Sequence, residues 1–336
     1  MSKRAVTVLL GDPTLPDRSK PGGRFTPDDR DQVERLRAAL ESLEAYDFSY
    51  WNRHRDLLER LREERPGFVL NFCDTGFRNE ARHELHVPAY LEMLGIPCSG
   101  SGPVALGACY DKGLVRSVAH SLGIPVPAER YLEPGTALAA EVTYPAFLKP
   151  NRGDGSLGIH PESIVGDRPA AERCLARLRE EVPGEGLLVQ QLLPGGEYSI
   201  GVIGNPGAGF TFPPALEVDY SALPSGLPRL LDYGSKTDPD SPYWQNVRFR
   251  RAELPAATLA RLETDCARLF ARLGLRDYAR FDFRADAEGE VRLMEVNPNP
   301  AWCHDGKLAH MVAQEGHGHA HLLDLIIDAA WRRCFG

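Results

Sequence analysis

Short apolar runs alternate with helical stripes over the first hundred residues. The runs AVTVLL (5–10) and FVLNF (68–72) predict buried strands, and YDFSYW (46–51) is a possible third strand. Between these runs, residues 28–44 predict one helix and residues 54–64 a second. The first helix places four apolar residues on one face, namely Val33, Leu36, Leu40 and Leu43. This alternation predicts a parallel α/β domain, closed by a helix and a short edge strand within 87–100.

Beyond residue 102 the pattern changes, because predicted strands follow one another directly. After a helical segment at 103–123, this clustering predicts α+β structure that is mostly antiparallel. We therefore expect three domains, an N-terminal one at 1–102, a central one at 103–204 and a C-terminal one at 205–336. The elements behind this expectation are strands at 128–133, 145–150, 187–193, 197–204, 215–219, 280–286 and 291–297, and helices at 168–181, 256–273 and 321–333.

Composition narrows the class of protein. The chain has 336 residues, 43% apolar and 26% charged, with a net charge of −8. This balance is typical of a soluble, mildly acidic protein and excludes a general nucleic-acid binder, which needs a basic face. We find no export signal and no apolar stretch of membrane-spanning length, so we expect a cytoplasmic protein. Seven scattered cysteines without a Cys-x-x-Cys pair fit free thiols in a reducing compartment.

A glycine pattern, FLKPNRGDGSLGI at 147–159, reads as Gly-x-Gly-x-x-Gly with Gly153, Gly155 and Gly158. A dinucleotide-binding turn needs a helix directly after the glycines, but the next residues contain Pro161 and no helical stripe. That interpretation fails, and a flexible loop between two strands remains. Its backbone N–H groups and Lys149 could hold phosphate, although a plain hairpin loop with a surface lysine is the open alternative.

A second pattern lies at 278–300. Glu295 and Asn297 are two apart on one predicted strand, so they share a face, and a hairpin could bring Asp282 opposite them. Two carboxylates and an amide oxygen suit Mg²⁺ or Mn²⁺. Arg280 shares the face of Asp282 and could stabilise an oxyanion. The alternative is an ordinary amphipathic hairpin with its polar face in water.

Five segments in this order resemble the ATP-grasp superfamily, and specifically the D-alanine–D-alanine ligase group, over about residues 68–330. The resemblance implies a three-domain ATP-grasp fold with ATP between two α+β domains. It also implies a carboxylate–amine ligase that works through an acyl phosphate, and a possible homodimer. The segments are LEMLGIPCSGSG with the Asp-Lys of ACYDKG, YPAFLKPNRGDGSLGI, LLVQQLLPGGEYSIGVIGN, DYGSKT and RFDF…LMEVNPNP.

The resemblance also implies a role for individual residues. Lys112 and Lys149 would meet nucleotide phosphates, with Gly155 and Ser156 in a loop that closes as a lid, and Lys236 would reach the γ-phosphate. Arg280, helped by the backbone N–H near Ala301, would stabilise the tetrahedral intermediate. The remaining roles are an adenine hinge at Gln190, Gln191 and Leu193, ribose binding by Glu197, and two Mg²⁺ (or Mn²⁺) ions on Asp282, Glu295 and Asn297.

The substrate side departs from the family pattern. The glutamate segment expected after the first strand is GDPTLPDRSKPGG here, and the family's His-Gly stretch is NFCDTGFRNEARHELH. Gly155, Thr237 and Gly306 stand where the family has serine, tyrosine and serine. We therefore expect a ligase of a specialised pathway that does not join two D-alanines. Candidate substrate residues, each equally readable as a solvated loop residue, are Arg78, His83, His86, His304, Asp305, Gly306 and Lys307.

Several alternatives stay open at this point. One is a true D-alanine–D-alanine ligase, and another is an imine-forming ligase as in mycosporine assembly. A nucleotide-binding protein without turnover and a kinase that stops at the acyl phosphate are two more. His317, His319 and His321 could chelate a metal or form a polar linker and cap. Cys303 reads as a packed side chain, and Trp302 and Trp244 could shape the pocket or simply pack.

Overall fold

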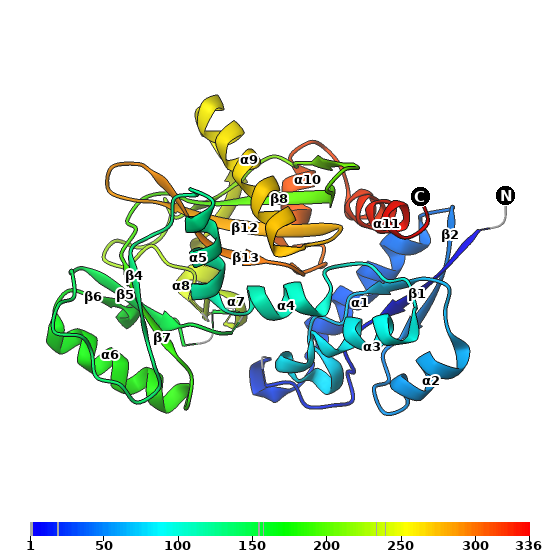
Figure 1. The fold of residues 1–336 in the computed structure, drawn as a ribbon, viewed down its shortest axis with the longest axis horizontal. Helices are drawn as coiled ribbons and strands as arrows, with labels where there is room; N and C mark the ends of the chain where they lie inside the picture. Colours follow the sequence, from blue (N-terminus) through cyan, green and yellow to red (C-terminus); the bar gives the residue numbers. More distant parts are fainter. Residues whose placement is uncertain (1–2, 19, 154, 157, 233, 239) are drawn as a thin grey trace.

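The computed structural model describes residues 3–18, 20–153, 155–156, 158–232, 234–238 and 240–336, with the backbone alone at Pro21, Lys236 and Thr237. Three sheets follow one another along the molecule (Figure 1). The three-stranded N-terminal sheet lies at one end and the four-stranded sheet at the other, with the six-stranded sheet between them. Both chain ends lie near the N-terminal sheet. Within the described residues, no helix is long and apolar enough to cross a membrane.

The N-terminal sheet confirms the predicted parallel α/β unit. Its strands are β1 (Arg4–Leu9), β2 (Tyr46–Trp51) and β3 (Val69–Asn71), in the order β2-β1-β3 and all parallel. The helices are α1 (Pro27–Glu41), α2 (Leu57–Glu64) and α3 (His86–Leu94). Thr26 begins α1 with a capping box, and Leu36 and Leu40 are buried against the sheet. The expected edge strand after α3 is reduced to one bridge between Val69 and Cys98.

The four-stranded sheet is antiparallel, in the order β4-β7-β5-β6. Its strands are β4 (Glu129–Leu132), β5 (Ala146–Pro150), β6 (Ile164–Val165) and β7 (Leu187–Gln191). Helix α6 (Arg168–Glu181) packs on it through a separate apolar core that includes Leu175 and Leu178. The helix occupies the predicted range because Asp167 caps it, accepting from the backbone N–H of Ala170.

The six-stranded sheet has the order β11-β10-β8-β12-β13, with β9 paired to β8. Helix α9 (Ala256–Leu273) covers one face together with α5 (Lys112–Ser121), and α10 (Lys307–Ala313) and α11 (His319–Phe335) lie on the other. Two short helices, α7 (Gly234–Thr237) and α8 (Pro242–Asn246), precede β11. The strands are β8 (Glu197–Asn205), β9 (Gly209–Thr211), β10 (Leu216–Asp219), β11 (Arg248–Arg251), β12 (Tyr278–Ala285) and β13 (Val291–Asn297).

Two expectations from the sequence differ from the structure. The single helix predicted at 103–123 is two helices, α4 (Pro103–Cys109) and α5 (Lys112–Ser121). The break occurs because Asp111 adopts extended backbone and caps α5 through the N–H of Leu114. The strand predicted at 197–204 as part of the central unit is β8, which pairs with β12 in the six-stranded sheet. The division into three domains remains a proposal, with this sheet boundary falling between β7 and β8.

Candidate active site

The polar face of the β12–β13 hairpin forms the centre of the site. Asp282 lies directly opposite Glu295, and Arg280 lies opposite Asn297. Asn297 Nδ2 is 3.0 Å from Asp282 Oδ2, so side chains from both strands meet in one place. Residues on the opposite face of the two strands are buried in the core, among them Phe281, Phe283, Leu293 and Val296, and a β-bulge lets Leu293 and Val296 share this face although they are three residues apart. The hairpin thus has the two-faced geometry that the spacing predicts.

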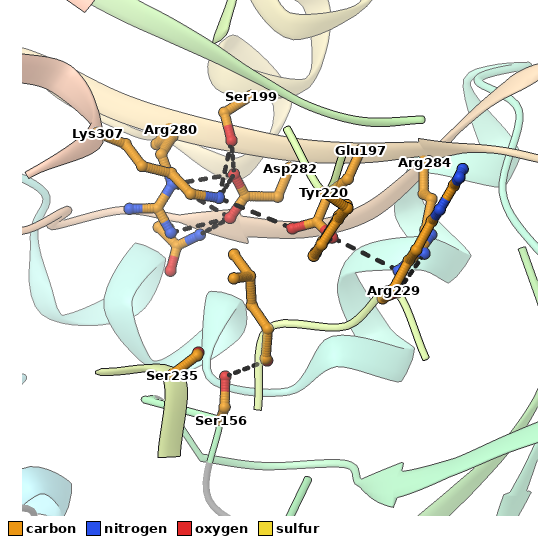
Figure 2. A network of polar contacts seen from close by, with 12 residues as sticks. Ser156, Glu197, Ser199, Tyr220, Arg229, Ser235, Arg280, Asp282, Arg284 and Lys307 are labelled. Atoms are coloured by element: carbon orange, nitrogen blue, oxygen red, sulfur yellow. Dashed lines mark hydrogen bonds and ion pairs between the residues drawn. The ribbon is translucent and has the colours of Figure 1, made fainter. Parts of the chain in front are cut away.

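Asp282 is surrounded by donors from three elements (Figure 2). Ser199 on β8 donates its hydroxyl to Oδ1 at 2.5 Å, and Arg280 NH2 is 2.8 Å from Oδ2. Lys307 Nζ is 3.5 Å from Oδ1. Burial alone would raise the pKa of Asp282. The charges of Arg280 and Lys307 and the hydrogen bonds outweigh burial and hold this pKa well below its usual range. The carboxylate is therefore ionised.

Glu197 forms a second acidic position beside Asp282, at the start of β8. Tyr220 donates its hydroxyl to Glu197 Oε2 at 2.7 Å, and Arg284 NH1 is 3.5 Å from the same oxygen. Lys307 Nζ is 4.0 Å from Glu197 Oε1. Figure 2 shows Tyr220 and Arg284 converging on Glu197 while Lys307 reaches toward both carboxylates. Burial, followed by the charge of Glu197, raises the pKa of Tyr220, which keeps the phenol neutral as a donor.

Lys149 on β5 brings a buried cation to the site. Its side chain is 3% exposed, and the described residues offer it no ion-pair partner within 4 Å. Burial lowers the pKa of its ammonium to about 7, the charges of Arg116 and Lys112 add to this, and Glu295 opposes it. A buried ammonium without a paired anion is costly unless a ligand supplies the anion. This position therefore fits a phosphate group better than it fits a surface lysine.

A chain of polar contacts links β7 to the β12–β13 hairpin through α5. Gln190 on β7 donates to Glu129 Oε2 at 3.0 Å, while its own Oε1 is buried without a hydrogen-bond donor among the described residues. Arg116 binds the same Glu129 oxygen at 2.6 Å and donates to the carbonyl of Met294 at 2.6 Å. The orphaned acceptor of Gln190 fits the exocyclic amine of a base such as adenine.

The rest of the expected hinge is also on or next to β7. Gln191 follows Gln190 and accepts from the backbone N–H of Ala128 at 3.3 Å, and Leu193 is buried. Sequence reasoning missed Arg116, although it follows Lys112 by one helical turn and so shares its face of α5. That spacing was the available signal for a second cation directed at the same region.

The glycine loop joins β5 to β6 in an antiparallel pair, as the sequence predicts. Gly153, Gly155 and Gly158 all have positive φ, a conformation that other residues adopt only with strain. Ser156 donates to the carbonyl of Leu231 at 3.1 Å, so the loop contacts the segment that leads to α7. Lys112 donates to the carbonyl of Gly153. The loop therefore lies against the C-terminal unit on one side of the site.

The substrate candidates fall into two groups. Lys307 joins the carboxylate cluster, and Gly306 directly precedes it as the N-cap of α10. The other candidates have contacts elsewhere among the described residues, and none is placed against the cluster. Gln32 binds His304 at 2.7 Å and Asp305 at 3.0 Å. Arg78 is exposed beside Phe77, and His83 stacks edge-on with His86. The side chains of Lys236 and Thr237 lie outside the described residues.

The histidine run does not direct its three rings to one place. Helix α11 begins at His319, whose ring binds the carbonyl of Trp302 at 2.7 Å, while His317 and His321 stack on each other. Within the described part of the chain, no three His, Cys, Asp or Glu side chains could hold a metal together. Asp282, Glu295 and Asn297 remain a two-carboxylate set completed by an amide, whose oxygens suit Mg²⁺. Burial raises the pKa of Cys303 far above its usual range, so this thiol is a packed side chain.

Comparison with known proteins gives consistent matches. The family model described as "D-ala D-ala ligase C-terminus" matches residues 128–328. A D-alanine–D-alanine ligase of Oleidesulfovibrio alaskensis is 28% identical, over 89% of this chain and 83% of its own. The D-alanine–D-alanine ligase of Bacillus anthracis complexed with ATP superimposes with a TM-score of 0.72 at 20% identity, covering 98% of both chains. The VanG D-Ala:D-Ser ligase of Enterococcus faecalis has a TM-score of 0.70 at 16% identity, over 98% of this chain and 100% of its own.

Proposed function

Because the chain belongs to the D-alanine–D-alanine ligase family, with its ATP-grasp fold, we propose that it joins a carboxylate to an amine through an acyl phosphate. In this proposal its two substrates are not both D-alanine. At the level of the family it is an ATP-dependent ligase that forms an amide bond. What we propose beyond the family activity is the identity of the residues that act on the substrates, and a role in a specialised pathway. The departures of the sequence from the family pattern support that role.

One observation carries the exclusion of two D-alanines. Gly306 stands where the family has the serine that takes the second substrate's carboxylate. A Cβ atom added there would lie 3.0 Å from the carbonyl oxygen of Ala301 and 3.1 Å from that of Cys303. A serine at this position would therefore require these backbone oxygens to give way by a few tenths of an ångström. A substrate carboxylate bound at that point would lose its hydroxyl donor, which costs affinity in a desolvated site.

The first-substrate side supports the same proposal. The family's glutamate for the first ammonium falls in the segment after β1, where two acids, Asp17 and Asp12, are buried; Asp12 lies nearer to the strand. Its carboxylate accepts from the hydroxyl of Thr14 at 2.6 Å and from the N–H of His54 at 2.8 Å. Asn79 binds the Asp12 backbone and holds the same segment from the other side. Asp12 therefore organises the loop and is not presented to a substrate. Family members with different substrates are known, since VanG is named a D-Ala:D-Ser ligase.

The chain's residues fit a division of labour around ATP and Mg²⁺, which supply the phosphoryl group and neutralise its charge. We assign the phosphates to Lys149 and Lys112, with Lys236 as the expected third cation. The base belongs at Gln190, Gln191 and Leu193, and the ribose hydroxyls at Glu197. Asp282, Glu295 and Asn297 would hold the metal. Arg280 would stabilise the oxyanion during amine attack, and Gly155 and Ser156 would exclude water as part of the lid.

The test is an ATP-consumption assay with D-alanine alone and with panels of carboxylates and amines. We expect turnover with a mixed pair, and D-alanine alone to stay well below the usual enzymatic kcat/KM of about 10⁴ M⁻¹s⁻¹. A value above that threshold with D-alanine alone refutes the proposal. The wild type should release phosphate from ATP, whereas a protein that only holds nucleotide would not. Asp282→Asn and Glu295→Gln should abolish this release. Hydroxamate formed with hydroxylamine in place of the amine reports the acyl phosphate.

A further inference from the structure

The ammonium of Lys307 lies where it would compete with a metal ion for the carboxylate of Asp282. Lys307 is the first residue of α10, and its side chain is 14% exposed. Its Nζ lies 3.0 Å from Ser199 Oγ, 3.5 Å from Asp282 Oδ1 and 4.0 Å from Glu197 Oε1. The ammonium thus bridges two carboxylates on neighbouring strands of the six-stranded sheet, as Figure 2 shows.

The local helix does not favour a cation at this place. The first turn of a helix carries partial positive charge from its unsatisfied N–H groups, so a lysine there is disfavoured by the helix itself. Lys307 is held instead by the carboxylates and by the ring of Phe249, whose centroid is 6.0 Å from Nζ. The position of the ammonium is therefore a property of the carboxylate cluster and not of α10.

Lys307 also completes the charge balance of this part of the site. Asp282 is paired with Arg280 at 2.8 Å, and Glu197 with Arg284 at 3.5 Å. With Lys307 between them, these two carboxylates already face three cationic side chains before any ion arrives. A second divalent ion placed on Asp282 would meet this ammonium at close range among largely buried side chains, where repulsion is strong.

We propose that the Lys307 ammonium takes the place of one of the two divalent ions that the family resemblance implies, so that this ligase binds its nucleotide with a single ion. The remaining ion belongs on the Glu295 and Asn297 side of the hairpin. This inference rests on the proposed function, because it concerns the same nucleotide and metal site. It also assigns Lys307 a role other than substrate binding, since the ammonium contacts Asp282 of the proposed metal set and Glu197 of the proposed ribose position.

The experiment counts bound Mn²⁺ on the full-length protein saturated with a non-hydrolysable ATP analogue, using electron paramagnetic resonance to measure free Mn²⁺. We expect one tightly bound ion per chain in the wild type and in Lys307→Arg, which keeps the charge. Lys307→Met should bind two. Lys3→Met, an exposed lysine far from the site, is the matched control and should bind one.

Each outcome decides a separate point. Two ions in the wild type overturn the inference and leave the proposed function standing. One ion in Lys307→Met removes the role assigned to Lys307. No ion in the wild type with nucleotide present contradicts the proposed function itself. Circular dichroism checks that Lys307→Met is folded, and Lys307→Gln, which is also uncharged but polar, repeats the measurement if it is not.

Discussion

Arg116 on α5 and Glu129 on β4 form an ion pair inside the protein, with NH2 and Oε2 2.6 Å apart and the arginine 1% exposed. The same carboxylate receives Gln190 Nε2, and the same guanidinium holds the carbonyl of Met294, next to Glu295. One buried pair thus connects the proposed adenine hinge with the proposed metal-site strand. Arg116 acts here as a positioning residue.

Replacing Arg116 should separate these two regions. We expect Arg116→Met to lower the free energy of unfolding by about 3 kcal/mol, because it leaves a partly buried carboxylate without its partner. The KM for ATP should rise more than kcat falls, since the hinge is displaced while the hairpin keeps its own contacts. Urea unfolding and steady-state kinetics measure both effects.

The exposed pair of Arg35 and Asp31 provides a matched control, and Arg35→Met should leave stability nearly unchanged. The double variant Arg116→Met/Glu129→Gln should recover part of the loss, because it removes the unpaired charge. Equal losses in the single and double variants would contradict the buried-pair account.

Lys149 predicts a pH dependence of stability in the nucleotide-free protein. Burial lowers its pKa in the folded state to about 7, below the ordinary value of 10.5. Between these two pH values the unfolded chain binds more protons than the folded chain, so folding stability rises with pH. The slope from this one group is at most about 1.4 kcal/mol per pH unit, and the penalty is constant below pH 7.

The measurement compares urea unfolding of the wild type and Lys149→Met at several pH values between 7 and 10. The variant should be the more stable of the two near pH 7, and the difference should shrink as pH rises. A bound ATP analogue should remove the dependence in the wild type by pairing the ammonium with phosphate. If the stabilities of the wild type and Lys149→Met change in parallel with pH, burial does not lower the pKa of the Lys149 ammonium.

Gly306 predicts a steric cost for the residue type that the family has there. Gly306→Ser should destabilise the protein by about 1–3 kcal/mol, because the new Cβ would press on the carbonyl oxygens of Ala301 and Cys303. We expect no gain of activity with D-alanine. Thermal unfolding and the ATP-consumption assay measure the two effects.

Gly318 serves as the matched control, because it is the N-cap of α11 and a Cβ there would contact nothing within 4 Å. Gly318→Ser should be neutral or slightly stabilising, since serine is a favoured N-cap residue. A stable Gly306→Ser variant that turns over D-alanine efficiently would refute the substrate assignment.

The backbone conformation of Gly155 predicts that substitutions there affect nucleotide binding. Its φ of 67° costs a non-glycine residue about 1–2 kcal/mol, although space for a Cβ is open. We expect an alanine in this exposed loop to relax in the free protein and to return to the glycine conformation when nucleotide binds. Gly155→Ala should then weaken binding of an ATP analogue about 5- to 30-fold and leave global stability nearly unchanged. Gly166→Ala, where neither φ nor space is restrictive, should leave binding unchanged. Calorimetric titration of the analogue distinguishes the two variants, and equal affinities would exclude the loop from nucleotide binding.

Much of the fold could be read from the sequence because the signals are local. The helices at 168–181 and 256–273 were predicted within their observed bounds, since an amphipathic stripe and its flanking residues lie in one stretch. The pairing of β12 with β13 was predicted as well, but a β-bulge between Asp282 and Phe283 shifts the register and brings Glu295 rather than Met294 opposite Asp282. The helix predicted at 103–123 was wrong because a capping aspartate inside the stripe was not weighed.

Other features of the site were decided by tertiary structure alone. Ser199 is 83 residues from Asp282 and Arg116 is 178 residues from Met294, and nothing local in either segment predicts the contact. Lys307 reads as a loop residue until α10 packs against the six-stranded sheet and directs its ammonium at Asp282. Periodicity and turns determine which side chains share a face of one element. Which elements then meet depends on how the apolar faces of distant segments bury one another, and only the folded chain supplies that arrangement.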